Sequence, residues 1–106
     1  MTAPQSLWPV HLAAAAEADF RDILQWTLQQ FGETQARTYG QTLSAALTSL
    51  SEGPAAHGVR ARDDILKGLF TLHVARNGRK GRHFILFRAA SSGDQQLIEV
   101  LRILHD

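Results

Sequence analysis

The sequence contains no cysteine, and this absence excludes two kinds of chemistry. Without a thiol the chain forms no disulfide bond and offers no thiolate nucleophile or thiolate metal ligand. Structural disulfides belong mainly to proteins of oxidising compartments, so we expect this chain in the reducing cytoplasm.

Long hydrophobic runs are also missing from the sequence. No stretch approaches the ~20 consecutive apolar residues of a membrane-spanning helix. The first residues do not show the basic and then apolar regions of a secretory signal. We therefore expect neither a membrane partner nor export.

The chain as a whole has no large excess of either charge sign, but its first half is acidic and its second half is basic. The net charge is only +1. Residues 1–59 hold two basic and five acidic residues, whereas residues 60–106 hold nine basic and five acidic ones. This asymmetry favours an acidic partner, either nucleic acid or an acidic protein segment, although a basic loop that contacts only water gives the same pattern.

The sequence does contain enough apolar residues for one small core. Its 106 residues are 44% hydrophobic and 20% charged, which is typical of a single globular domain, here residues 1–106. Leu7–Leu12 is a short candidate strand. Pro9 confines this strand to the edge of a sheet, because proline cannot donate to a strand ladder.

Two amphipathic helices are predicted next. The first runs from Ala13 to Phe31 and the second from about Glu33 to Leu50, with Gly32 as the break between them. So short a break makes the two helices fold back as an antiparallel hairpin. Apolar residues at helical spacing form one stripe on each helix: Ala16, Phe20, Ile23, Leu24, Leu28 and Phe31, then Ala36, Tyr39, Leu43, Ala46, Leu47 and Leu50.

The second half of the chain predicts strands. After an irregular polar segment, Ala55–Lys67, the alternation in Leu69–Ala75 indicates a half-buried strand. Asn77-Gly78 predicts a hairpin turn into Arg82–Arg88. A loop rich in Gly, Ser and Asp follows, and the aliphatic run Leu97–His105 predicts a strand buried on both faces and lying inside the sheet.

These elements, in the order β-α-α-β-β-β, predict the α+β class. We expect an N-terminal edge strand and an antiparallel helical hairpin packed on a three- to four-stranded antiparallel sheet.

The five histidines do not predict a metal site. No two of them are four residues apart, and none lies near a cysteine or a carboxylate cluster. The GRKG stretch at residues 78–81 lacks the strand-to-helix context of a phosphate-binding loop, and Ser91 does not belong to a nucleophile elbow. We expect neither a metal nor a cofactor.

One group of side chains does carry possible chemistry. Arginine and histidine together can bind phosphates and transfer protons, which is what metal-free RNA cleavage requires. The same groups can pair with carboxylates of a protein partner, and Arg79 and Lys80 can also simply be solvated. The group comprises Arg76, Arg79, Lys80, Arg82, His83 and Arg88 on the predicted hairpin, with Arg102 and His105 on the last strand.

The ordered spacing of several residues resembles a known family. Ala16-x2-Asp19-Phe20-x2-Ile23 is followed by Gly32-x3-Ala36-x2-Tyr39-x3-Leu43-x3-Leu47-x2-Leu50-x3-Pro54-x3-Gly58, and the chain closes on Val100-Leu101-Arg102-Ile103-Leu104-His105. Over about residues 7–105 this set resembles toxins of the ParE/RelE superfamily, and the RILH ending resembles the ParE branch. Phe70 and Phe87 depart from the family, which often has Arg and Tyr at these two positions.

The resemblance implies the toxin of a bacterial type II toxin–antitoxin pair. Its antitoxin would have a DNA-binding N-terminal part and a C-terminal segment that is disordered when free and becomes ordered as it wraps the toxin. ParE-branch toxins inhibit DNA gyrase, whereas RelE-branch toxins cut messenger RNA on the ribosome. The family places the antitoxin or the target on the sheet face that the helices leave open.

The charge favours the ParE branch. Ribosome-dependent nucleases of this fold tend to be strongly basic because phosphate contacts dominate their binding, whereas this net charge is +1. We therefore expect a gyrase inhibitor that acts by protein–protein contact, is not an enzyme, and forms a hetero-oligomer with a ParD-like antitoxin. The alternative is a ribosome-dependent mRNA endoribonuclease with Arg82, Arg88 and His105 as catalytic residues and Tyr39 as a packing residue.

For the antitoxin we expect a groove between the helical hairpin and the sheet. Trp26 lies off the packing stripe of its helix, so it either covers a flank or faces a partner. The residues predicted to contact antitoxin or target are Trp26, Arg76, Arg79, Lys80, Arg82, His83, Arg102 and His105.

Overall fold

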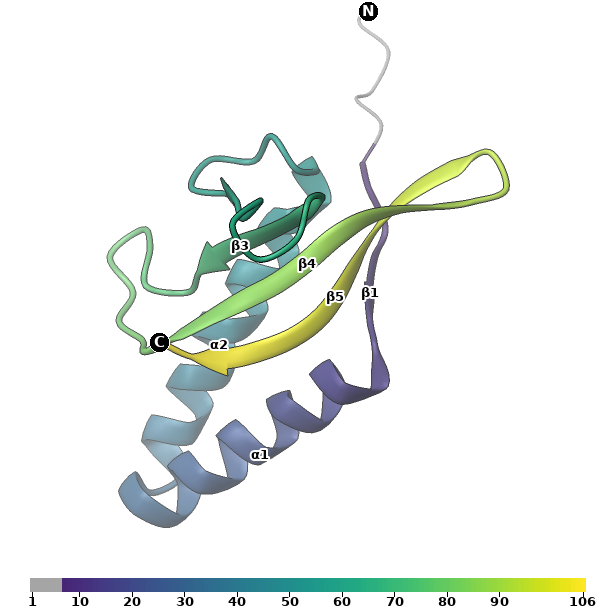
Figure 1. The fold of residues 1–106 in the computed structure, drawn as a ribbon. Coiled ribbons are helices and arrows are strands. Elements are labelled where there is room, and N and C mark those ends of the chain that lie inside the picture. The colour runs from purple at the N-terminus through teal and green to yellow at the C-terminus, as the bar shows by residue number, and fades with distance from the viewer. Residues whose placement is uncertain (1–6) are drawn as a thin grey trace, which may run out of the picture.

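A computed structural model of the chain describes residues 7–106 and shows a helical hairpin on one face of a five-stranded sheet (Figure 1). The class is α+β, as predicted, while residues 1–6 of the predicted domain lie outside the described residues. Neither helix in the described part of the chain is long and apolar enough to cross a membrane.

The two helices confirm the predicted hairpin. Helix α1 covers Ala14–Phe31 and helix α2 covers Glu33–Ser49, with a short 3₁₀ turn, η1, at Leu50–Glu52. Gly32 joins the helices with a φ of 90°, a value that glycine adopts without steric cost, and its amide donates to the Leu28 carbonyl at 2.9 Å.

The sheet has the order β1-β5-β4-β3-β2, so the first strand lies at one edge and the last strand lies inside. The strands are β1 (Val10–Leu12), β2 (Arg60–Ala61), β3 (Leu69–His73), β4 (His83–Ser92) and β5 (Gln95–His105). The predicted positions of the edge strand and the inner strand are confirmed. The sheet is mixed rather than wholly antiparallel, because β1 pairs parallel with β5. No hairpin joins β1 to β5, so the connection does not force them to run in opposite directions.

The strands β4 and β5 continue through the region predicted to be a loop. They pair out to Ser92 and Gln95, and only Gly93-Asp94 forms the turn, with Gly93 at a φ of 63°. Glycine at the first central position is typical of a two-residue hairpin turn. Figure 1 shows this hairpin projecting beyond the rest of the sheet. Residues with weak strand preference are held here by pairing with the opposite strand.

The Asn77-Gly78 turn forms, but not as a two-residue hairpin. Asn77 and Gly78 have φ values of 52° and 79°, and the Arg79 amide donates to the Arg76 carbonyl at 2.9 Å. The strands themselves end at His73 and His83, so the connection is a longer loop over residues 74–82. Val74 is fully buried and still donates its amide to the His83 carbonyl at 3.1 Å, and the chain leaves the sheet after this residue.

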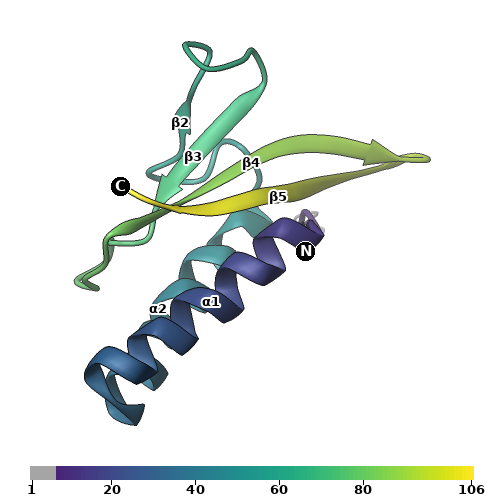
Figure 2. The same cartoon turned by 60° about the horizontal axis from the view of Figure 1, so that its bottom comes forward.

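The core lies between the helices and one face of the sheet. Figure 2 shows both helices beneath that face and the other face uncovered. The buried apolar side chains of the core are Ala16, Leu43, Ala46, Leu50, Leu72, Val74, Ile85, Phe87, Ile98, Val100 and Ile103. Leu28 and Phe31, which belong to the predicted stripe of α1, are instead exposed because the end of the hairpin extends past the sheet.

Strand β5 is buried on one face only, so the prediction of burial on both faces is wrong. Ile98, Val100 and Ile103 are buried, whereas Arg102 and His105 are exposed. The register passes from Phe87↔Val100 to Leu86↔Arg102, which leaves Leu101 as the extra residue of a β-bulge. The bulge changes which residues point inward, so that Ile103 joins Ile98 and Val100 on the helix-covered face.

Candidate functional site

A cavity of about 600 Å³ lies between the far end of the helical hairpin and the ends of β4 and β5. The second half of α1 and the start of α2 form one side, and the end of the sheet forms the other. The sequence predicted an antitoxin groove in this region. The lining residues are Asp22, Ile23, Trp26, Thr27, Phe31, Gln35, Tyr39, Gly81, Arg82, His83 and His105.

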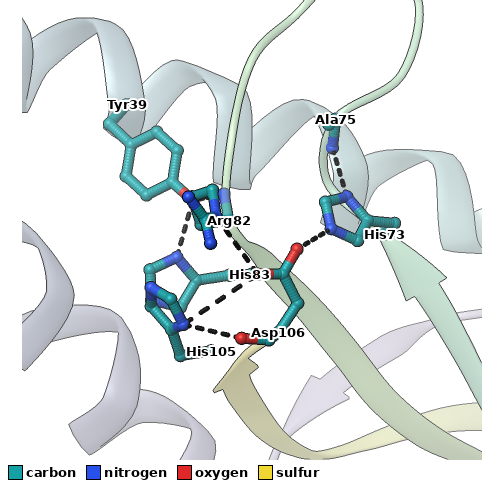
Figure 3. Close-up of polar contacts among 7 residues, drawn as sticks. All are labelled: Tyr39, His73, Ala75, Arg82, His83, His105 and Asp106. Carbon is teal, nitrogen blue, oxygen red and sulfur yellow. Dashed lines mark hydrogen bonds and ion pairs between the residues drawn. The ribbon is translucent and has the colours of Figure 1, made fainter.

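A tyrosine from α2 joins the helices to the sheet at the base of this cavity. The Tyr39 hydroxyl lies 2.6 Å from Nδ1 of His83 and accepts a hydrogen bond from the Arg82 amide at 3.2 Å (Figure 3). The phenol has one hydrogen, and donating it to Nδ1 satisfies both groups. This assigns His83 as a neutral imidazole with its hydrogen on Nε2.

The surroundings of Tyr39 and His83 favour the neutral form of both side chains. Burial lowers the pKa of His83 below 6.5, and repulsion from His105 lowers it further. The rings of His83 and His105 meet edge to face with their centroids 5.0 Å apart. Burial also raises the pKa of Tyr39 above 10.0, so the phenol keeps its hydrogen near neutral pH. Tyr39 therefore has a polar contact in addition to the packing role predicted for it.

A second polar group, which we name the C-terminal cluster, surrounds Asp106 and includes His73, Arg82 and His105. Nε2 of His73 lies 2.7 Å from one Asp106 oxygen, and Nε of Arg82 lies 3.3 Å from the other (Figure 3). His105 Nδ1 lies 2.9 Å from the Asp106 carbonyl oxygen. The hydrogen bond from His73 holds the pKa of the Asp106 carboxyl below its usual value.

His73 and Asp106 were not predicted to belong to one cluster. The two residues are 33 positions apart, and no spacing pattern connects them. They meet because β3 and β5 both flank β4 and end at the same side of the sheet as the start of β4.

Arg102, a predicted partner contact, pairs with a residue of helix α1. Its Nε and Nη2 donate to the two carboxylate oxygens of Asp19 at 2.7 and 3.0 Å. The same carboxylate accepts the Ile103 amide at 2.9 Å, where β1 has ended and β5 has no strand partner on that side. The hydrogen bond from Arg102 holds the pKa of Asp19 below 3.8.

The structure does not bring the three candidate catalytic residues together. Arg82 and His105 both line the cavity. Arg88 does not line it, and its Nε pairs with Glu99 at 2.7 Å across β4 and β5. The alternation of β4 places Arg88 on the face opposite to the buried Phe87, which is the face without helices.

The remaining predicted basic residues lie on the loop before β4. Arg76 donates to the Ser49 hydroxyl at 2.7 Å and so fastens this loop to the end of α2. Arg79 and Lys80 are exposed and make no ion pair within residues 7–106. Trp26 and His83, the other two predicted contacts, line the cavity. In the same described range no three His, Asp or Glu side chains are arranged to hold a metal ion.

Known proteins are similar to this chain both in sequence and in fold. The family model described as the ParE toxin of the type II toxin–antitoxin system parDE matches residues 10–106. A chain of the chromosomal ParDE system from P. aeruginosa is 19% identical, with a TM-score of 0.75 over 95% of this chain and 98% of that one.

More distant structures share the same fold. A chain of the RelBE2 toxin–antitoxin complex from Mycobacterium tuberculosis is 18% identical, with a TM-score of 0.61 over 94% of this chain and 99% of that one. A YoeB/ParE toxin from Agrobacterium tumefaciens is 12% identical, with a TM-score of 0.59 over 92% of this chain and 98% of that one. Curated protein sequences gave no match. Because the family model spans nearly all of the described residues, the chain belongs to the ParE toxin family of type II toxin–antitoxin systems.

Proposed function

We propose that this toxin inhibits DNA gyrase by protein–protein contact and that a ParD-like antitoxin neutralises it. The observation that carries the proposal is the match of the ParE family model over residues 10–106. The modest net charge of +1 supports the ParE branch, because a toxin that acts on a protein does not need the many phosphate contacts of an RNA-binding enzyme.

The polar contacts support a role without catalysis. Arg102 is paired with Asp19 and Arg88 with Glu99, so two of the basic side chains on β4 and β5 stabilise the fold. Arg88 pairs with Glu99 in the ladder and lies away from His105, which pairs with His83, so only Arg82 and His105 of the predicted catalytic set line the cavity.

Two surfaces are open to the antitoxin. One is the uncovered face of the sheet, where Phe84, Leu86 and Leu104 are half-buried. The other is the cavity beside the helical hairpin, with the exposed rings of Trp26 and Phe31 at its mouth. A segment that is disordered when free and becomes ordered on binding can cover two separate surfaces of this kind.

The direct test is a supercoiling assay with purified gyrase. Purified toxin at micromolar concentration should block supercoiling, and the cognate antitoxin should restore it. Supercoiling that proceeds at the normal rate with folded toxin would contradict the proposed target.

A second candidate function is supported by one observation, the pair of imidazoles at the cavity. His83 and His105 lie edge to face beside Arg82, and imidazole and guanidinium groups together can transfer protons and bind phosphate. This candidate predicts cleavage of messenger RNA in a ribosome translation assay. His105→Ala and Arg82→Ala should abolish cleavage, whereas Arg60→Gln on the distant strand β2 should not. Intact message with the native toxin would exclude it.

A further inference from the structure

The turn Asn77-Gly78 carries the only asparagine of the chain. Both residues are exposed, and their φ values of 52° and 79° lie in the left-handed region, which asparagine and glycine adopt more readily than other residues. The turn belongs to the loop over residues 74–82, outside the strands β3 and β4. The Asn77 side chain is part of neither the core nor the cavity.

No contact restrains the two groups of this turn that can react with each other. Within residues 7–106, no hydrogen bond of this loop involves the Asn77 side chain. The Gly78 amide makes no backbone hydrogen bond in the same range. A Cβ at Gly78 would meet no atom within 4 Å, so the space around this residue is open. The Asn77 side chain can therefore approach the Gly78 nitrogen, and position 78 has no side chain that would block it.

Positive charge surrounds the turn. Arg76 precedes Asn77, and Arg79 and Lys80 follow Gly78. Arg79 and Lys80 are exposed, and neither makes an ion pair in the part of the chain that the structure describes. A backbone amide nitrogen attacks a side chain only after it has lost its hydrogen. Nearby cations stabilise the nitrogen anion that results, and so they favour this attack.

The two residues can react without a cofactor. The Gly78 nitrogen gives up its proton and forms a bond to Cγ of Asn77, the bond from Cγ to the side-chain nitrogen breaks, and this nitrogen leaves with the proton as ammonia. The product is a succinimide ring. Water then adds to one of the two ring carbonyls, and the bond from that carbonyl to the Gly78 nitrogen breaks, which gives aspartate or isoaspartate. The whole reaction consumes one water and releases one ammonia, and nothing is oxidised or reduced.

We propose that Asn77 is a site of spontaneous deamidation, promoted by Arg79 and Lys80, which converts this residue to aspartate or isoaspartate in the folded toxin. The proposal concerns the chemistry of one turn. It depends neither on the target nor on the antitoxin of the proposed function.

The conversion changes the loop in two ways. It adds one negative charge at neutral pH, so the formal net charge of +1 becomes 0. The new carboxylate lies beside Arg79 and Lys80 and lowers the positive charge that this loop presents to a partner. Isoaspartate also adds one carbon to the backbone between the Arg76 carbonyl and the Arg79 amide. These two groups share a hydrogen bond of 2.9 Å, which the longer backbone should break.

The experiment follows the mass of folded toxin during incubation at physiological temperature and mildly alkaline pH. Loss of the amide should raise the mass of one chymotryptic peptide, residues 73–84, because chymotrypsin cuts after Leu72 and Phe84 and this peptide holds the only asparagine. Asn77→Gln should show no such rise, since its longer side chain would have to close a larger and less favourable ring.

Matched variants test the role of the charges. Arg79→Gln should slow the conversion about twofold or more, because it removes a positive charge beside the reacting nitrogen. Arg60→Gln removes an exposed arginine on β2 and should leave the rate unchanged. Both residues are exposed, so both variants should fold, and a normal thermal transition checks this. A rate for Arg79→Gln equal to native would overturn the role given to the positive charges.

Two outcomes would overturn the site itself. The mass of folded toxin could stay constant while the same chain unfolded in guanidinium chloride is converted, which would show that the loop protects Asn77. The mass could also rise at the native rate in Asn77→Gln, which would place the modification at another residue. Toxin that fails to inhibit gyrase leaves these mass measurements unchanged, so failure of the proposed function is distinguishable from failure of this proposal.

The two products separate the effect of charge from the effect of the longer backbone. Asn77→Asp has the new charge without the added carbon, and its Tm should equal that of native toxin. The isoaspartate form, isolated by chromatography, should have a lower Tm because the turn loses the hydrogen bond between Arg79 and Arg76. Equal Tm values for the two forms would overturn the effect on the turn.

Discussion

At the scale of single residues, Asp19 shows how one side chain replaces a missing strand. Strand β1 ends at Leu12, and beyond Val100 the edge of β5 has no neighbouring strand. The Asp19 carboxylate accepts a hydrogen bond from the Ile103 amide, which has no strand partner on that side, and two more from Arg102. Asp19 is one of the residues that carried the family resemblance, and its structural role explains that position.

Asp19→Ala should lower the free energy of unfolding by about 1–3 kcal/mol, because the Ile103 amide and Arg102 both lose their acceptor. Urea denaturation followed by circular dichroism measures the change. Asp22→Ala, one turn further along the same helix on an exposed side chain, should change stability by less than about 0.5 kcal/mol. Equal effects of the two substitutions would show that the Asp19 contacts do not stabilise the fold.

His83 makes the stability of the protein depend on pH. The folded state lowers its pKa below 6.5, so folding favours the neutral ring. The stability contributed by the neutral His83 is present above about pH 6.5 and is lost as the pH falls through the lower folded pKa. His83→Gln cannot titrate, so its unfolding free energy should change less between about pH 7 and pH 5 than that of the native protein. The same pH dependence in both proteins would exclude His83 as the titrating group.

At the scale of elements, the loop over residues 74–82 packs against helix α2 at the end of the sheet that borders the cavity. Gly81 lies against two side chains, and a Cβ at this position would be 2.6 Å from Val74 Cγ2 and 2.9 Å from Tyr39 Cε1. The absence of a side chain lets the loop bring the Arg82 amide to the Tyr39 hydroxyl. The loop thereby ties α2 to the start of β4.

Gly81→Ala should therefore destabilise the protein by about 1–3 kcal/mol through overpacking. Gly40→Ala is the matched substitution, since its Cβ would lie 3.5 Å from the nearest atom of Leu24, an ordinary contact, and alanine favours a helix. Thermal unfolding should show a lower Tm for the first variant and an unchanged or higher Tm for the second. A Tm for Gly81→Ala equal to native would mean that the loop moves aside without cost.

At the scale of the whole molecule, the fold leaves one sheet face and one end of the helical hairpin without a cover (Figure 2). A protein of 106 residues has few apolar side chains to spare for its surface. Trp26 and Phe31 are nevertheless exposed. Large apolar side chains exposed in this way are typical of a surface that a protein partner covers.

Trp26→Ala separates folding from binding at this scale. Because Trp26 is 56% exposed, its loss should change the free energy of unfolding by less than about 1 kcal/mol. Added antitoxin should raise the Tm of native toxin, since a ligand that binds only the folded state stabilises it by mass action. At equal antitoxin concentration the rise should be smaller for Trp26→Ala. Differential scanning fluorimetry with increasing antitoxin measures both, and an equal rise would contradict a contact at Trp26.

The sequence by itself determined the features that depend on neighbouring residues. Helical spacing predicted α1 and α2, and Gly32 predicted the break. Asn77-Gly78 predicted a hairpin turn, and a turn forms there with positive φ at both residues, although within a longer loop. Pro9 predicted an edge strand, as observed for β1. Periodicity and turn chemistry act over a few residues, so they can be read before the chain is folded.

Only the tertiary structure decided the features that join distant residues. Asp19 and Arg102 are 83 positions apart, and His73 and Asp106 are 33 apart. The helices cover only one face of the sheet, so β5 is buried on one face, where its aliphatic run had predicted two. The bulge at Leu101 sets which residues lie on the buried face. The pairing register and such ion pairs depend on which strands become neighbours in the sheet. A pattern of neighbouring residues in the sequence does not show which strands these are.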